Sequence, residues 1–140
     1  MQRDPVSKYF LFLFFLLSAT TNYGQIIINI TSGGDEGPTS GTNWSISGTT
    51  LTSTGTANIQ ASVIVNALSS GNLTVEATDI TVEENVISAT ANALTLKASG
   101  NIKVQHNTSI ETEGGNIILW SNSDNSSGGN ILTGQNVTLD

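Results

Sequence analysis

The stretch GNLTVEATDITVEENVISATANALTLKASGNIKV, residues 71–104, alternates aliphatic side chains with Thr or Lys in short runs. Three of these runs are Leu73-Thr-Val75, Leu94-Thr-Leu96 and Ile102-Lys-Val104. Successive side chains of a strand point to opposite faces, so this alternation predicts short strands with one apolar face each. Gly-Asn and Ser-Gly pairs between the runs allow sharp corners. No helical spacing is found from residue 25 onward, and the sequence therefore predicts an all-β chain.

A pair made of Asn and an aliphatic residue recurs at nearly even intervals across this stretch and beyond it. The pairs are Asn58-Ile59, Asn72-Leu73, Asn85-Val86, Asn101-Ile102, Asn116-Ile117 and Asn130-Ile131. With further strand signals halfway between them, an apolar segment begins about every seven to eight residues. Short strands joined by corners rather than hairpin turns favour a chain wound into a β-solenoid. Coils of about 15 and of about 22 residues both fit the spacing.

The Asn residues of the repeat predict a structural ladder. An amide at the same corner of each coil can hydrogen-bond to its equivalents above and below. In the tripeptide Gly-Asn-Ile, we expect Gly to free the turn, Asn to form the ladder and Ile to enter the core. The alternative is that Asn and Gly are ordinary loop residues. The predicted ladder residues are Asn58, Asn72, Asn101, Asn116 and Asn130.

The N-terminal segment, residues 1–24, has the pattern of a helical secretory signal peptide. Two cations precede an apolar run at positions 9–17, and small and polar residues follow it. The run is shorter than the ~20 residues that a membrane-spanning helix needs, which disfavours an uncleaved anchor. Cleavage is predicted between Gly24 and Gln25, with cleavage after Ala19 as the alternative. The mature chain is then handed to secretion machinery, has no transmembrane span and ends in the medium or on a bacterial cell surface.

The mature chain divides into two parts by pattern. Residues 25–57 contain a strand signal, a Gly-rich loop and a return of the alternation, which predicts an N-terminal cap with the first coil. Trp44 is expected to serve as a cap or core aromatic. Residues 58–140 are predicted to be β-helix repeats. They end inside a strand signal, which favours the beginning of a longer protein or a truncated product.

Charge and composition exclude several function classes. The net charge is −7 with only four Lys and Arg residues, so binding to nucleic acid is not expected. There is no Cys, and His106 is the single His, so neither a zinc site nor a catalytic triad can be assembled. Carboxylate pairs such as Glu111 and Glu113 are interpreted as solubilising surface charge. The sequence thus predicts no catalytic residue, no metal and no cofactor.

Two runs carry a resemblance to a known family. Leu94-Thr-Leu-Lys-Ala-Ser-Gly-Asn-Ile102 and Gly114-Gly-Asn-Ile-Ile-Leu-Trp-Ser121 resemble the filamentous haemagglutinin-like repeat region of secreted Bacteroidetes surface adhesins. The likeness covers about residues 44–140. It implies a right-handed parallel β-helix that is displayed outside the cell and that binds a glycan or a protein receptor.

The expected function is that of a non-catalytic, exported structural or adhesive surface protein, the N-terminal part of a longer β-helical adhesin. One alternative is a fragment of a polysaccharide-processing β-helix enzyme, which would need clustered carboxylates with Arg or Lys in a cleft. Another is an ice-binding β-solenoid, which would need Thr-x-Thr on one face of every coil. That pattern occurs at Thr52-Ser-Thr-Gly-Thr56 and does not recur at the corresponding points of later coils. Whether Trp120 points inward or outward is left open by the sequence.

Overall fold

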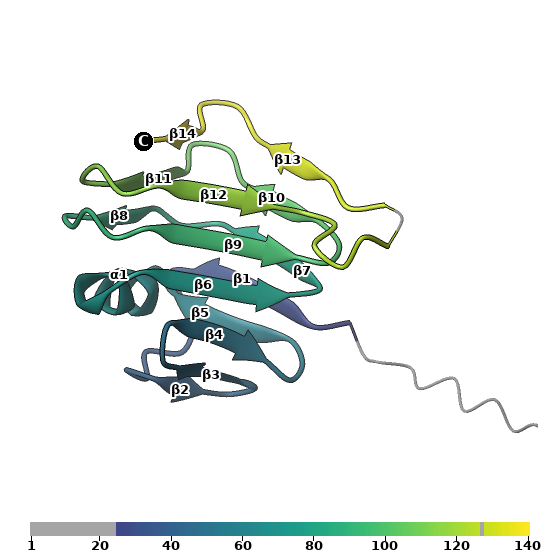
Figure 1. Ribbon diagram of the computed structural model, residues 1–140, viewed down its shortest axis with the longest axis horizontal. Helices are drawn as coiled ribbons and strands as arrows, with labels where there is room; N and C mark the ends of the chain where they lie inside the picture. Colours follow the sequence, from purple (N-terminus) through teal and green to yellow (C-terminus); the bar gives the residue numbers. More distant parts are fainter. Residues whose placement is uncertain (1–24, 127) are drawn as a thin grey trace, which may run out of the picture.

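A computed structural model describes residues 25–126 and 128–140. This part of the chain forms fourteen strands and one helix (Figure 1). The elements are β1 (Ile27–Thr31), β2 (Ser40–Gly41), β3 (Trp44–Ser47), β4 (Thr50–Ser53), β5 (Ala57–Gln60), α1 (Ala61–Ser70), β6 (Leu73–Ala77), β7 (Asp79–Val82), β8 (Val86–Ser88), β9 (Leu94–Ala98), β10 (Ile102–Val104), β11 (Ser109–Thr112), β12 (Ile117–Trp120), β13 (Ile131–Thr133) and β14 (Thr138–Leu139).

The strands assemble into three sheets in which most neighbours run parallel. A six-stranded sheet has the order β12-β9-β6-β4-β3-β2, a five-stranded sheet has the order β13-β10-β7-β1-β5, and a three-stranded sheet has the order β14-β11-β8. The predicted signal peptide, with Gly24 and the cleavage point, lies outside the described residues. Within residues 25–126 and 128–140, no helix is long and apolar enough to cross a membrane.

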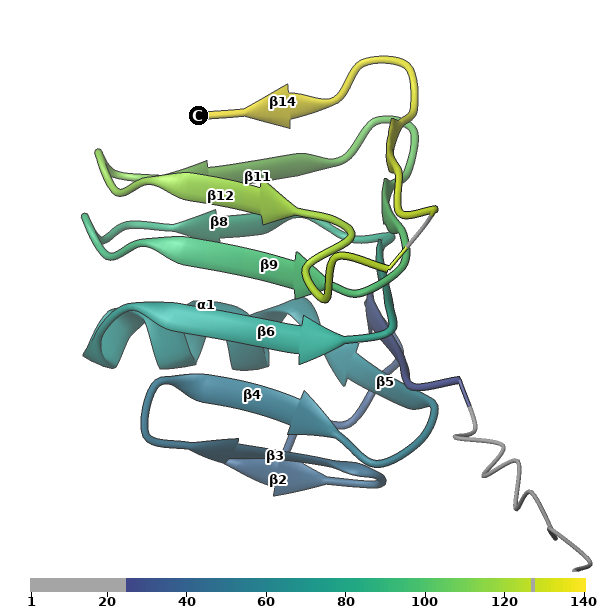
Figure 2. The ribbon, with the colours of Figure 1, turned by 45° about the vertical axis from the view of Figure 1, so that its right-hand side comes forward.

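The chain enters the three sheets in a fixed order from β6 onward. We call each passage a level: β6-β7-β8, then β9-β10-β11, then β12-β13-β14, which are stacked from the middle to the top of Figure 2. Between the first two levels, Leu73 pairs with Leu94, Ile80 with Ile102 and Val86 with Ile110. Three strands therefore make one level, and the longer of the two predicted repeat lengths fits the sequence separation of these partners.

The predicted alternation places the aliphatic side chains between the sheets. Val75, Leu96 and Val104 have no exposed surface, whereas the residue before each of them is partly or fully exposed. Because partners in adjacent strands share a face, each aliphatic residue stacks on the corresponding residue of the next level. Burial of one such side chain contributes about 1.5 to 3 kcal/mol. The core is thus built level by level from the sequence alternation.

A small antiparallel unit precedes the parallel levels. β3 pairs with β2 on one side and with β4 on the other, and β4 then pairs in parallel with β6. Trp44 in β3 is only 4 % exposed and belongs to the core. Its indole Nε1 donates a hydrogen bond to the carboxylate of Asp35 over 3.2 Å. β3 and β2 therefore end the six-stranded sheet and lie lowest in Figure 2.

The first strand of the described chain is inserted where sequence order would not place it. β1 lies between β5 and β7 and pairs in parallel with both. Ile28 and Ile30 have no exposed surface and continue the inward rows of these two strands. The first strand of the described residues is thus an interior strand of its sheet.

The helix α1 corrects the prediction that helical spacing is absent after residue 25. Ala61, Val63, Ile64 and Leu68 of this helix are buried, and it contacts β8 (Figure 1). The helix α1 follows β5 in the chain, just as β8 follows β7 and β11 follows β10, so a helix stands where the later levels have a strand. A helix is about 10 Å wide, close to two strand spacings of ~4.8 Å. The extra strand β1 widens the neighbouring five-stranded sheet by one such spacing, which accommodates the helix.

The glycines of Gly-Asn-Ile have a different role from the one expected. Gly115 and Gly129 each begin a copy of the tripeptide, and neither has a positive backbone φ. The positive φ belongs to the residue before each of them, Gly114 and Gly128. A Cβ on Gly115 would lie 2.3 Å from the carbonyl oxygen of Asn92 in the level below. Close approach of two backbones, rather than a left-handed conformation, therefore requires glycine inside the tripeptide.

Candidate functional site

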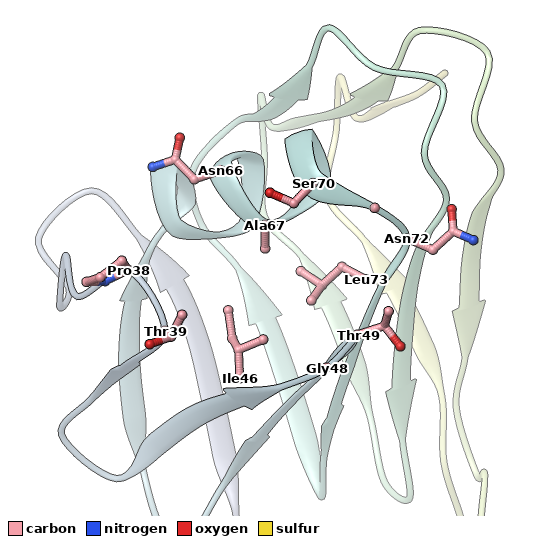
Figure 3. A pocket seen from close by; sticks show the side chains of 11 residues that line it. Pro38, Thr39, Ile46, Gly48, Thr49, Asn66, Ala67, Ser70, Asn72 and Leu73 are labelled. Atoms are coloured by element: carbon pink, nitrogen blue, oxygen red, sulfur yellow. The ribbon is translucent and has the colours of Figure 1, made fainter.

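A groove opens between α1 and the antiparallel unit (Figure 3). Ile46, Ala67 and Leu73 point toward one another across it and form its apolar part. Asn66 and Ser70 of the helix line the groove on one side, while Thr39 and Thr49 line it on the other; its volume is about 380 Å³. The helix α1, which is wider than a strand, forms one wall of this groove, and the antiparallel unit forms the other.

The chemistry of this groove is limited by its lining. Its residues are Pro38, Thr39, Ile46, Gly48, Thr49, Asn66, Ala67, Ser70, Gly71, Asn72 and Leu73, none of which ionises near neutral pH. General acid–base catalysis needs a positioned side chain that can exchange a proton. These side chains can support apolar contact and hydrogen bonding.

The outer face of the six-stranded sheet carries two columns of outward side chains. One column passes through Thr50, Thr74, Thr95 and Ile118 in register, and the other through Thr52, Glu76, Lys97 and Trp120. Both columns cross β4, β6, β9 and β12, which lie one above another in Figure 1. The strand Ile117–Trp120 alternates half-buried and exposed residues, so the direction of Trp120 is outward.

Lys97 links the charged and aromatic members of the second column. Its Nζ lies 3.0 Å from Oε1 of Glu76 and 5.5 Å from the centroid of the Trp120 ring. A cation within about 6 Å of an indole centroid is attracted to the negative face of the ring. Trp120 is nevertheless 50 % exposed. A large aromatic surface is thus held in place and still open to a ligand.

A shallow hollow adjoins this cluster. Glu76 and Lys97 line it together with hydroxyl groups, among them those of Thr52, Ser99 and Ser123, and its volume is about 310 Å³. Ser123 reaches it because the segment after β12 descends to the end of β9, where Ser123 donates its N–H to the carbonyl oxygen of Ala98 over 2.9 Å (Figure 2). The hollow therefore combines one carboxylate, one ammonium group and several hydroxyls.

Of the five Asn residues predicted to form a ladder, Asn101 and Asn130 are brought together. Asn101 receives the N–H of Asn130 on its Oδ1 atom over 3.2 Å. The same Asn101 donates to Oδ1 of Asp79 from its backbone N–H over 2.7 Å and from its side chain over 3.2 Å. Gln25, the predicted first residue of the mature chain, donates to the other oxygen of Asp79. This row runs along one corner of the five-stranded sheet.

The remaining three Asn residues lie elsewhere. Asn58 is in β5, where it accepts a hydrogen bond from the side chain of Asn29 over 2.9 Å. Asn72 and Asn116 precede β6 and β12 at a corner of the six-stranded sheet. Asn72 accepts the N–H of Ala93 over 2.9 Å, and the carbonyl oxygen of Asn116 accepts the N–H of Leu94 over 2.9 Å. The five residues therefore lie at two different corners and, for Asn58, within a strand, and they do not form one row.

The ionisable residues are dispersed. Within the described part of the chain, no group of three or more His, Asp and Glu residues could hold a metal ion. His106 is exposed, and its Nδ1 atom accepts the N–H of Gln135 over 2.9 Å. The backbone N–H of Thr42, with the indole N–H of Trp44, lowers the pKa of Asp35 below its usual value. These contacts tie the loop containing Asp35 to the antiparallel unit.

Sequence reasoning missed the cluster of Glu76, Lys97 and Trp120. These residues belong to three different strands, and only the register between parallel strands makes them neighbours. A repeat length of about 22 residues, applied to the outward positions, would have aligned them.

No protein-family model, no curated protein and no solved structure matches this chain.

Proposed function

We propose that the chain forms a right-handed parallel β-helix and acts as an exported, non-catalytic surface protein of the adhesive kind. The observation that carries this proposal is the register of successive levels, which gives a rigid stack with outward columns of side chains. Right-handed crossovers prevail almost without exception between parallel strands of one sheet. Stacks of this type offer long, regular binding surfaces.

The arrangement of polar groups supports a binding role over an enzymatic one. Hydrolysis of glycosidic bonds ordinarily uses two carboxylates that flank the scissile bond. The hollow beside β9 has a single carboxylate, Glu76, and that group is paired with Lys97. The groove of Figure 3 has none. Neither place supplies the pair of groups that the enzyme alternative requires.

An ice-binding role gains one supporting observation. Thr50, Thr74 and Thr95 are register partners and form a column on the outer face. A Thr-x-Thr array needs a second column of Thr beside the first. The neighbouring column has Thr52 in β4, but its next members are Glu76 and Lys97. We therefore prefer the adhesive function, and a measurement of thermal hysteresis with the full chain distinguishes the two.

Export is tested with the full chain, tagged at its C-terminus and produced in a bacterial host. The expected product begins at Gln25, and proteinase K added to intact cells removes the tag. Leu13→Arg interrupts the apolar run and serves as the matched control, because it should leave an uncleaved chain inside the cell. Retention of the parent chain in the cytoplasm, with its first residues intact, would contradict the proposal.

A further inference from the structure

Trp120 is the exposed aromatic side chain on the outer face of the six-stranded sheet. The other Trp of the chain, Trp44, is 4 % exposed and packed in the core, whereas Trp120 is 50 % exposed. Single exposed aliphatic residues are common on proteins, but a half-exposed indole fixed by a neighbouring cation is a more informative feature. An indole presents a broad apolar face and a polar N–H edge, which suits a ligand that is itself apolar on one face and polar at its rim.

The hollow that shares Lys97 with the indole contains both hydrogen-bond donors and hydrogen-bond acceptors. Lys97 can only donate, Glu76 in its ionised form can only accept, and the hydroxyls of Thr52, Ser99 and Ser123 can do either. Lys97 belongs both to the hollow and to the contact with Trp120, so hollow and indole form one continuous surface. Sugars have this same combination of an apolar C–H face and a rim of hydroxyl groups.

The charge of this surface favours an uncharged ligand. Lys97 and Lys103 are the only Lys or Arg residues between positions 25 and 140. The charge of Lys97 is balanced by Glu76 at 3.0 Å, and the whole chain carries a net charge of −7. A polyanion would meet repulsion with no cationic surface to offset it.

We propose that Trp120, Lys97 and Glu76 form a binding site for a neutral polysaccharide. One sugar ring stacks on the indole face of Trp120 that Lys97 leaves open, while hydroxyls of neighbouring sugar units bond to Glu76, Lys97 and the hydroxyl side chains of the hollow. The inference rests on the proposed function, since it names the ligand class of the outer face. Lys97 lies against the indole and pairs with Glu76, so the three side chains are already neighbours without a ligand.

The two Trp residues make the site measurable by fluorescence. The full chain is titrated with dextran, hydroxyethyl cellulose and a neutral galactomannan, with polygalacturonate as the acidic comparison. Acrylamide quenches Trp120 and leaves the buried Trp44 largely protected, so bound sugar should reduce the quenching. The Kd values of the variants are measured by isothermal titration calorimetry, which needs no Trp as a probe. Trp120→Ala should raise the Kd at least about tenfold, an effect at the upper end of aromatic stacking. Trp120→Phe should retain most of the affinity because it keeps an aromatic face.

Ile87→Ala is the matched control. Ile87 is 52 % exposed on β8, in the three-stranded sheet, so its substitution removes a similar exposed apolar surface from another face. Its Kd should stay within about twofold of the parent. Circular dichroism of each variant verifies that the fold is retained.

Three results would overturn the site: no saturable protection by any of the neutral polysaccharides, an unchanged Kd in Trp120→Ala, or binding to polygalacturonate alone that added salt abolishes. Failure of the sugar site and failure of the surface function are separable. A chain that reaches the cell surface and binds no sugar contradicts only the site. A chain that binds sugar and stays in the cytoplasm contradicts only the surface function.

Discussion

Lys97 and Glu76 are register partners on adjacent parallel strands, and the Nζ of Lys97 lies 3.0 Å from Oε1 of Glu76. Their side chains are 33 % and 40 % exposed. In a double-mutant cycle with Lys97→Met and Glu76→Gln, we expect a coupling free energy below about 1 kcal/mol, because solvent screens exposed pairs. Urea denaturation measures it. The coupling should fall further in molar salt. A coupling that salt leaves unchanged would contradict the description of Lys97 and Glu76 as a solvent-exposed ion pair.

Leu96 lies in the core of the stacked levels, and Thr95 beside it points outward. Leu96→Ala should lower the free energy of unfolding by about 2 to 5 kcal/mol, because it removes buried methyl groups and leaves a cavity. Thr95→Ala, on the same strand, should change it by no more than about 0.5 kcal/mol. Chemical denaturation of both variants checks this difference. Equal effects of the two substitutions would contradict the placement of Leu96 on the inward face of β9 and Thr95 on its outward face.

Gly115 and Gly71 hold equivalent places before β12 and β6, with different surroundings. A Cβ on Gly115 would meet the Asn92 carbonyl oxygen at 2.3 Å, whereas a Cβ on Gly71 would meet nothing within 4 Å. Gly115→Ala should therefore destabilise the chain by about 1 to 3 kcal/mol through overpacking. Gly71→Ala should cost far less. Thermal unfolding of both variants provides the comparison, and a reversed order would refute the close approach between levels.

Asn29 lies in the middle of β1, between β5 and β7. Asn29→Pro should destabilise the chain by about 2 kcal/mol or more, because proline cannot donate the backbone hydrogen bond of a central strand. Asn29→Ala removes only the exposed side-chain bond to Asn58 and should cost less than about 1 kcal/mol. Hydrogen exchange of β5 and β7 should rise in the proline variant alone. Unchanged exchange there would contradict the inserted position of β1.

Asp35 gives stability a dependence on acid pH. Its folded pKa is lowered by the N–H of Thr42 and the indole of Trp44, so folding favours the ionised carboxylate. This contribution is present above the unfolded-state pKa of about 3.9 and is lost as pH falls through the lower folded value. The difference in unfolding free energy between the parent and Asp35→Asn should therefore shrink from pH 6 toward pH 2. Urea titrations at several pH values measure it, and a constant difference would argue against these hydrogen bonds.

The alternation in residues 71–104 predicted where the aliphatic side chains go. Leu73, Val75, Leu94 and Leu96 are all buried, because the period of two is a local property of an extended chain. The helix was missed for an equally local reason. Residues 61–70 contain Val and Ile, have no acidic residue in the first turn and no basic residue in the last, and begin without a side-chain cap. The spacing of Val63, Ile64, Ala67 and Leu68 was the available signal.

The sequence by itself determined the strand periodicity, the inward and outward faces, and the scarcity of groups for acid–base chemistry. Tertiary structure alone decided that β1 enters between β5 and β7, that Gly115 lies against Asn92, and that Trp120 meets Lys97. Periodicity follows from backbone geometry within a few residues. Register between strands that are distant in the sequence follows from packing and close backbone approach, which no short stretch of sequence contains.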